Sequence, residues 1–389
     1  MTKMLTKSAL ALFDSLIAFD TTSRNSNLKL IEWIESYLDG HGVSSHRVAS
    51  PDGSKASLHA SIGPAVEGGI ILSGHSDVVP VDGQNWSSDP FAVTRRGDRL
   101  YGRGTCDMKG FIALALAGVP LFKDGKRPVH LAISYDEEVG CLGAPALIAD
   151  IASQLPTPAM AIVGEPTMMK VVTGHKGITV HTVEVLGHEA HSSLTHLGVS
   201  ANMIAVELMH DLAELARTLW EQADPESPFV PPHATLTIGE MQGGTAANIL
   251  ARNASFVFDL RCPPSVDPDA VLAPFKSKIG LLDQQLKNSF PDTGITINQL
   301  SNAPPLSPQG LEDAEAFVRK LTGDNSPAGA VAYAAEAGQF RQAGFPTVIC
   351  GPGSIEQAHQ PDEYIAVEQF ERGALFMERL AEELKVEHK

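Results

Sequence analysis

The chain has 389 residues, of which 43% are hydrophobic, and a formal net charge of −17 from 29 Lys plus Arg against 46 Asp plus Glu. This length exceeds one average hydrophobic core, so two domains are expected. The acidic balance argues against a nucleic-acid-binding protein, which needs a basic face, and no apolar run approaches the roughly 20 residues of a membrane span.

The first segment, Met1 to Phe19, combines two lysines with an apolar patch, so a signal peptide has to be considered. Asp14 interrupts the patch and no small-residue cleavage site follows, which favours a surface helix. A cytoplasmic location is therefore the default expectation. The apolar face of this helix is expected to pack on the body of the protein through Leu5, Ala9, Leu12, Phe13 and Leu16. The scattered cysteines, with no C-x-x-C pair, suit free thiols in a reducing compartment; they are Cys106, Cys141, Cys262 and Cys350.

The first part of the chain alternates short apolar strands with helices. Strands are predicted over residues 69–74, 129–134 and 159–163, and an apolar helix over 108–121. Buried strands spaced by helices are typical of an α/β sandwich around a mostly parallel sheet. After the proline-rich stretch 303–308, helix and strand patterns resume to the end of the chain.

From about residue 178 the pattern changes to half-polar strands and amphipathic helices. The predicted elements, in chain order, are a strand at 178–186, a helix at 199–219, strands at 233–241 and 254–261, a helix at 270–286 and a strand at 295–300. The order β-α-β-β-α-β is that of a ferredoxin-like unit. We therefore expect a discontinuous α/β domain over residues 1–177 and 300–389, with a ferredoxin-like α+β domain inserted over 178–299.

Metal-binding residue types recur where the predicted buried strands end. In open α/β sheets, sites form beyond the carboxyl ends of the strands, so these groups are expected to converge in one crevice. So many acidic groups need cations to hold them together, and a carboxylate and imidazole set suits zinc or a similar divalent metal. Only Asp107, which follows the Gly-rich segment 102–106, has no clear strand before it. The groups are His75, Asp77, Asp107, Asp136, Glu137, Glu138 and Glu165.

Each of these groups also has a simpler explanation. A histidine at a strand end is more often a hydrogen-bonded structural residue, an acidic pair is usually solvated surface, and Asp107 or Asp77 could cap a turn or helix. The metal site is favoured because all of these groups except Asp107 follow a predicted buried strand. Neighbouring side chains on extended backbone point to opposite sides, so one of Glu137 and Glu138 can bind metal while the other serves as the general base of a hydrolase.

Competing catalytic motifs are incomplete. Gly102 and Gly104 form a G-x-G pair, but Asp107 stands where a dinucleotide-binding loop has its third glycine. The sequence also lacks the G-x-x-x-x-G-K-[ST] phosphate loop and the G-x-S-x-G elbow of α/β-hydrolases.

Several motifs resemble the zinc-dependent aminoacylase and carboxypeptidase superfamily, which contains acetylornithine deacetylases and succinyl-diaminopimelate desuccinylases. The resemblance runs from about residue 10 to residue 380. The motif at 350–364, together with HKG at 175–177 and ELMHD at 207–211, is most similar to the acetylornithine deacetylase branch. The motifs are SGHSDVVPVDGQNWSSDPF (73–91), LYGRGTCDMKGF (100–111), DEEVG (136–140), VGEPT (163–167), GHEAHSS (187–193) and CGPGSIEQAHQPDEY (350–364).

The resemblance implies a centre of two zinc ions, for which cobalt can substitute. His75, Asp107 and Glu165 would hold one ion. Asp107 would bridge to the second ion, held also by Glu138 and His359. The peptide bond after Asp107 is expected to be cis.

The resemblance also implies roles beyond the ligands. Glu137 would be the general acid/base, and Asp77 would orient the ring of His75. The inserted domain would be a lid and dimerisation domain of a homodimer, in which His191 reaches the partner subunit's site and stabilises the oxyanion. Asn248 and Arg261 would bind the substrate carboxylate, a task that suits an always-charged guanidinium.

The reaction implied is hydrolysis of N2-acetyl-L-ornithine to L-ornithine and acetate, a step of arginine biosynthesis, with Glu336 in the AEAG stretch as a candidate for holding the substrate ammonium. One alternative is a related N-acyl-amino-acid deacylase or succinyl-diaminopimelate desuccinylase, because the metal site recognises only the amide bond and not the rest of the substrate. Another is a non-catalytic binding protein of the same fold. The presence of Glu137 and of all five expected ligands argues against this alternative.

Overall fold

The computed structural model describes residues 2–386, which divide into two compact units. The first unit contains the chain up to Gly174, Leu306–Ala330 and the chain from Ala335 onward, and the second contains His175–Pro305 and Val331–Ala334. These limits lie a few residues from the expected boundaries, and the short return of the chain at Val331–Ala334 was not expected. Met1 and residues 387–389, which the expected first domain included, lie outside the described residues.

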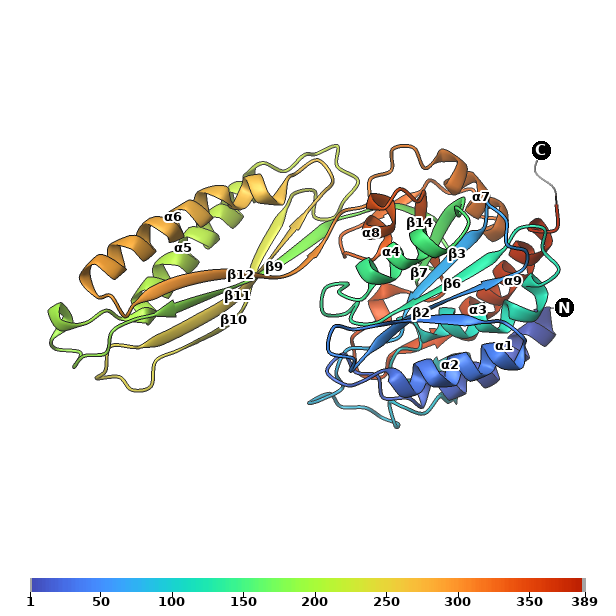
Figure 1. Cartoon of the computed structure of the whole chain (residues 1–389), viewed down its shortest axis with the longest axis horizontal. Coiled ribbons are helices and arrows are strands. Elements are labelled where there is room, and N and C mark those ends of the chain that lie inside the picture. Colours follow the sequence, from blue (N-terminus) through green and yellow to red (C-terminus); the bar gives the residue numbers. More distant parts are fainter. Residues whose placement is uncertain (1, 387–389) are drawn as a thin grey trace. The chain divides into compact units, whose positions relative to one another are not determined.

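An eight-stranded sheet forms the middle of the first unit, in the order β1-β2-β6-β3-β7-β14-β8-β13 (Figure 1). Strands β6, β3, β7 and β14 run parallel in the centre, whereas β1, β2 and β8 are antiparallel to their neighbours. The central strands are buried along their whole length, as expected where helices cover both faces. The strands are β1 (Ser45–Ala49), β2 (Ala56–Ile62), β3 (Ile70–His75), β6 (Val129–Ser134), β7 (Met160–Pro166), β8 (Val172–His175), β13 (Gly329–Val331) and β14 (Thr347–Gly351).

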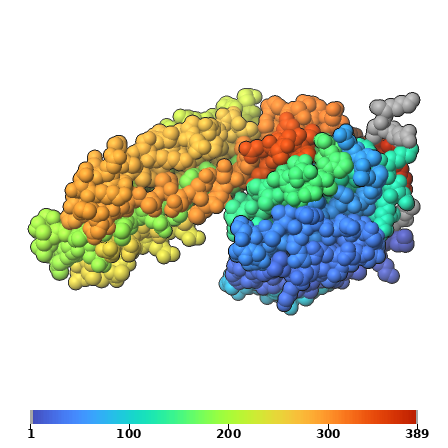
Figure 2. Space-filling view, viewed as in Figure 1, coloured from blue at the N-terminus to red at the C-terminus, as the bar shows by residue number. Residues whose placement is uncertain are grey.

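Helices cover both faces of this sheet, so the predicted α/β sandwich is confirmed. On one face lie α1 (Thr2–Ile17), α2 (Leu28–Gly40), α3 (Lys109–Phe122), α7 (Glu312–Thr322) and α9 (Val367–Glu383); on the other lie α4 (Ala144–Gln154) and α8 (Ala337–Gln342). Helix α1 buries four residues of its expected apolar face, whereas Leu12 is only partly buried. Segments from different parts of the chain thus share the surface of the first unit, where Figure 2 shows blue, green and orange-red segments.

A small second sheet of the first unit brings distant loops together. Its order is β15-β5-β4, with β4 at Thr94–Arg96, β5 at Arg99–Tyr101 and β15 at Tyr364–Ala366. Residues just before β15 therefore run beside those just after β5, and the Gly102 N–H donates to the carbonyl of Glu363. The short 3-10 helix η2 (Ile355–Gln357) precedes this contact in the chain.

The second unit is the predicted ferredoxin-like unit. Its four antiparallel strands have the order β10-β11-β9-β12, and α5 and α6 pack on the sheet around a core that includes Val183, Leu208 and Phe258. Burial alternates along β9 and β11, which explains their half-polar sequences. The elements are β9 (Gly177–Leu186), η1 (Thr195–Leu197), α5 (Ala201–Glu221), β10 (Thr235–Gly243), β11 (Asn253–Cys262), α6 (Pro268–Ser289) and β12 (Gly294–Ala303).

Two general expectations can be compared with residues 2–386. No helix there has the length and apolar character needed to cross a membrane. The four cysteines of the chain are buried and unpaired.

Candidate metal centre

Three neighbouring parallel strands carry most of the site. His75 is the last residue of β3, Glu165 lies near the end of β7, and Glu137 and Glu138 follow β6. Because β6, β3 and β7 are parallel and adjacent, their carboxyl ends meet at one edge of the sheet. The predicted convergence of these groups therefore follows from the strand order.

The remaining two groups come from loops outside the central sheet. Asp107 precedes α3 and is joined to Met108 by a cis peptide bond, as the resemblance predicted. His359 lies between η2 and β15. The β15–β5 pairing described above brings these two loops side by side.

Asp107 lies between two imidazoles. Its Oδ1 is 2.9 Å from Nε2 of His75, and its Oδ2 is 3.4 Å from Nε2 of His359. The same His359 nitrogen is 3.0 Å from Oε2 of Glu138, and Nε2 of His75 is 3.8 Å from Oε1 of Glu165. The five groups thus form two adjacent sets that share one carboxylate.

The acidic pair divides between two groups of side chains that share His75. Ligand atoms of His75, Glu137 and Glu165 all lie within 4.8 Å of one another, and so do those of His75, Asp107 and Glu138. Glu138 additionally contacts His359. The distances allow Glu137 either to bind a cation or to carry a proton. Its role therefore has to be argued from its pKa and from the reaction.

The charges of the site are buried, which costs free energy unless a cation balances them. The side chains of His75, Asp107 and Glu165 are almost fully enclosed, and Oε1 of Glu165 has no hydrogen-bond partner among residues 2–386. Burial, with the neighbouring charge of Asp107, raises the pKa of Glu165 well above its usual range and the pKa of Glu138 to about 7.

The pKa values of the two imidazoles are raised as well, because neighbouring carboxylates favour the charged form of a histidine. Hydrogen bonds to Asp107 and Glu138 raise the pKa of His359 to about 10. Burial lowers the pKa of His75, but hydrogen bonds to Asp107 and Asp77 outweigh it and raise that pKa well above its usual range. The imidazole and carboxylate donor set fits zinc-type ions, whose positive charge would balance the buried carboxylates.

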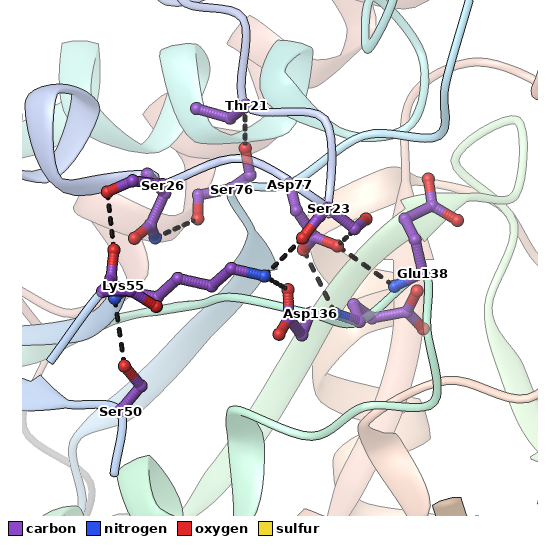
Figure 3. Close-up of polar contacts among 12 residues, drawn as sticks. Thr21, Ser23, Ser26, Ser50, Lys55, Ser76, Asp77, Asp136 and Glu138 are labelled. Carbon is purple, nitrogen blue, oxygen red and sulfur yellow. Dashed lines mark hydrogen bonds and ion pairs between the residues drawn. The ribbon is translucent and has the colours of Figure 1, made fainter. Parts of the chain in front are cut away.

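Asp77 supports both the histidine and the acidic pair, and Figure 3 shows its contacts with Ser23 and Glu138. Its carboxylate accepts the backbone N–H groups of Glu137 at 3.1 Å and Glu138 at 3.3 Å, and the hydroxyl of Ser23 at 2.7 Å. The ring of His75 donates from Nδ1 to the backbone carbonyl of Asp77 at 2.9 Å, while the nearer carboxylate oxygen is 3.6 Å away. Asp77 therefore orients His75 mainly through its main chain.

A lysine that the sequence analysis did not identify completes this support. The Lys55 ammonium donates to the Asp136 carboxylate and to the Ser23 carbonyl, as Figure 3 shows. Both Lys55 and Asp136 are largely enclosed, and Asp136 has the left-handed backbone angle φ 56°. The ion pair thus anchors the turn from which Glu137 and Glu138 project. A single lysine before a strand gives no sequence signal of such a role.

The expected substrate-binding residues have different settings. Glu336 precedes α8 in the first unit and is 1% exposed; its Oε2 accepts from the Ser73 hydroxyl, and its Oε1 has no hydrogen-bond partner within residues 2–386. His191, Asn248 and Arg261 belong to the second unit.

Within the second unit, two loops carry His191 and Asn248 beside each other. The Ser192 N–H donates to the Asn248 carbonyl. The side chains of His191 and Asn248 are exposed. Ring Nδ1 of His191 is 2.8 Å from the Ser193 hydroxyl. Arg261, on β11, donates from Nε to Asp259 at 3.0 Å.

The family model of peptidase family M20/M25/M40 matches residues 71–383. The chain belongs to this family. The acetylornithine deacetylase of Myxococcus xanthus is 34% identical over 367 residues, 93% of each chain. That of Aliivibrio fischeri strain MJ11 is 33% identical over 363 residues, 90% of each chain.

Solved structures of the family share the fold. A family M20 metallo-carboxypeptidase from Sulfolobus solfataricus has a TM-score of 0.72 at 18% identity, covering 97% of this chain and 99% of that one. A dinuclear metal-binding M20 peptidase from Bacillus subtilis has a TM-score of 0.65 at 13% identity, covering 97% and 98%. With the relatives above, family membership makes the chain a metal-dependent amide hydrolase.

Proposed function

We propose that this enzyme hydrolyses N2-acetyl-L-ornithine to L-ornithine and acetate, a step of arginine biosynthesis, in the cytoplasm. The observation that carries the proposal is the shared Asp107 carboxylate between two imidazoles, with the Glu137 carboxylate beside it. The similarity to acetylornithine deacetylases over about nine-tenths of the chain supports the choice of substrate.

The residues fit two zinc ions, for which cobalt would substitute. His75, Asp107 and Glu165 would hold one ion, and Asp107, Glu138 and His359 the other. When bound, such ions supply Lewis-acid chemistry, which polarises an amide carbonyl and lowers the pKa of water.

Glu137 is proposed as the proton carrier. Burial raises the pKa of its carboxyl well above the usual range, with the charges of Glu138 and Asp107 acting in the same direction and His75 opposing them. A carboxylate with a raised pKa can take a proton from the attacking water and return it to the departing amine near neutral pH. Asp77 fixes the main chain from which this side chain projects by accepting the Glu137 N–H.

Roles in substrate binding are proposed for four further residues. His191 of a partner subunit would stabilise the oxyanion in a homodimer, and Asn248 and Arg261 would hold the substrate carboxylate. Glu336 is proposed to bind the substrate ammonium through its unpaired oxygen. Since it is 1% exposed, the ammonium can reach it only if the surrounding side chains rearrange.

A panel assay tests the substrate. Purified enzyme with zinc or cobalt is given N2-acetyl-L-ornithine, other N-acetyl amino acids and N-succinyl-diaminopimelate, and released amine is measured. The proposal expects the highest kcat/KM for acetylornithine. Preference for another acyl amino acid would retain the chemistry and reject the substrate, and no hydrolysis of any member would favour a binding protein.

A further inference from the structure

Three metal-binding side chains meet in the first unit outside the centre described above. They are His46 on β1, His59 on β2 and Asp150 on α4. Nε2 of His59 lies 2.7 Å from Oδ2 of Asp150, and Nε2 of His46 lies 3.4 Å from the same oxygen. We propose that these residues form a separate site for one divalent d-block cation of the zinc type.

The register of the sheet builds this site. His46 and His59 are directly opposite each other in the antiparallel β1–β2 pair, with ring centroids 5.2 Å apart. Directly opposed residues project on the same face of a sheet, and α4, which packs against both strands, places Asp150 beside the two rings. Three secondary-structure elements therefore fix the ligands, so little side-chain freedom is lost when a cation binds.

The three side chains differ in exposure in a way that suits an open metal site. His59 is 5% exposed and Asp150 22%, whereas His46 is 54% exposed. His59 and Asp150 form the more buried side of the site. A cation can enter from solvent on the side of His46. Zinc sites with three protein ligands keep the fourth position for water or another small ligand.

The donor set selects the class of cation. Two imidazole nitrogens and one carboxylate oxygen suit zinc, cobalt or nickel, whereas calcium and magnesium prefer all-oxygen shells. Bonds of about 2.0–2.1 Å in a tetrahedron place ligand atoms roughly 3.3 Å apart, so the observed 3.4 Å contact fits and the 2.7 Å contact has to open slightly.

Protonation also favours binding. Burial lowers the pKa of His59, although the hydrogen bond and charge of Asp150 oppose this effect. The neutral ring can present Nε2 to a cation once its proton moves from Nε2 to Nδ1. A zinc-type ion can therefore bind the neutral His59 ring by a change of tautomer, in which the cation takes the place of the Nε2 proton in the contact with Asp150.

A hydrogen-bonded cluster without metal affinity is the competing explanation, and Asp150→Asn separates the two. An asparagine oxygen can still accept from a His59 N–H, but it is a neutral and weaker ligand. His46→Ala removes an exposed ligand and leaves the fold of the strand pair intact. His210→Ala, at an exposed histidine on α5, is the matched control.

The experiment measures bound zinc per chain after equilibrium dialysis of untagged enzyme against buffered Zn²⁺. Wild type and His210→Ala should bind one equivalent more than His46→Ala or Asp150→Asn, and a zinc-dependent rise in Tm should shrink in the same two variants. Hydrolytic activity should be unchanged in all of them. Equal zinc content in all four proteins would overturn the proposal. The comparison is a difference between variants, so it holds whatever the catalytic centre binds or hydrolyses.

Discussion

The carboxylate of Asp77 accepts the backbone N–H of Glu137 at 3.1 Å, although 60 positions separate the two residues. The main-chain carbonyl of Asp77 also accepts the ring N–H of His75. Asp77 therefore orients the imidazole of His75 and fixes the main chain of Glu137, the proposed proton carrier. These two contacts hold His75 and Glu137 in a defined relative position.

Glu137→Gln tests the proton carrier directly. The amide keeps the shape of the side chain but cannot shuttle a proton, so kcat should fall by roughly 10²–10⁴-fold. Zinc content, measured on the same sample, should stay at the wild-type level. Near wild-type turnover with metal bound would contradict the assigned role, and loss of one equivalent of zinc would show that Glu137 is a ligand.

Lys55→Met tests whether the Lys55–Asp136 ion pair positions the turn before Glu137. Without the ammonium, Asp136 and the Ser23 carbonyl lose their shared donor, and small displacements of catalytic groups cost up to about 10²-fold in rate. We expect kcat to fall by roughly tenfold or more with KM little changed. Lys29→Met, at an exposed lysine on α2, is the control and should retain wild-type kcat. A purely structural role would lower Tm in the Lys55 variant and leave kcat of the folded enzyme intact.

How far the site can be predicted from sequence depends on how each residue reaches it. His75, Glu138 and Glu165 stand at the ends of apolar strands, so the strand pattern alone predicts their convergence. His359 depends on the pairing of two three-residue strands, β5 and β15, which are too short to show a pattern, and only the family resemblance identified it. Lys55 acts through a contact across 81 positions that no local pattern encodes.

The folds of the two units were easier to predict than their details. Uniformly apolar strands indicate a covered parallel sheet, and alternating strands indicate an antiparallel sheet with helices on one face. The His46–His59 pair shows the limit, because it depends on the register between β1 and β2. Neither strand is apolar enough throughout to be recognised from composition.

Glu363→Gln should weaken the loop that carries Asp107. The Glu363 carboxylate accepts from the Arg103 guanidinium and from the N–H groups of Cys106 and Asp107, and both members of the ion pair are 1% exposed. Removing one partner of a buried pair typically costs about 3–5 kcal/mol. Denaturant unfolding should show a loss of this order, together with weaker zinc retention against a chelator. Glu356→Gln, at an exposed position of η2, should change neither quantity; an equal loss there would refute the assignment.

Metal removal should destabilise the enzyme more as pH rises. A group whose pKa is higher in the folded chain stabilises the fold below its unfolded pKa, and this contribution is lost as pH rises through the folded pKa. Burial raises the pKa of Glu138 to about 7 from 4.5, and hydrogen bonds raise that of His359 to about 10 from 6.5. Both shifts therefore make the metal-free centre less stable as the pH increases from 6.5 to 8.

Bound cations remove this dependence, because they balance the ionised carboxylates. The gap in Tm between zinc-loaded and chelated enzyme should widen over pH 6.5 to 8, by on the order of 5 °C. Buried titratable groups away from the centre, such as His130, affect both forms alike and cancel in the difference. Calorimetry of both forms at several pH values measures the gap; a gap that stays constant or narrows would show that Glu138 and His359 do not hold the cations.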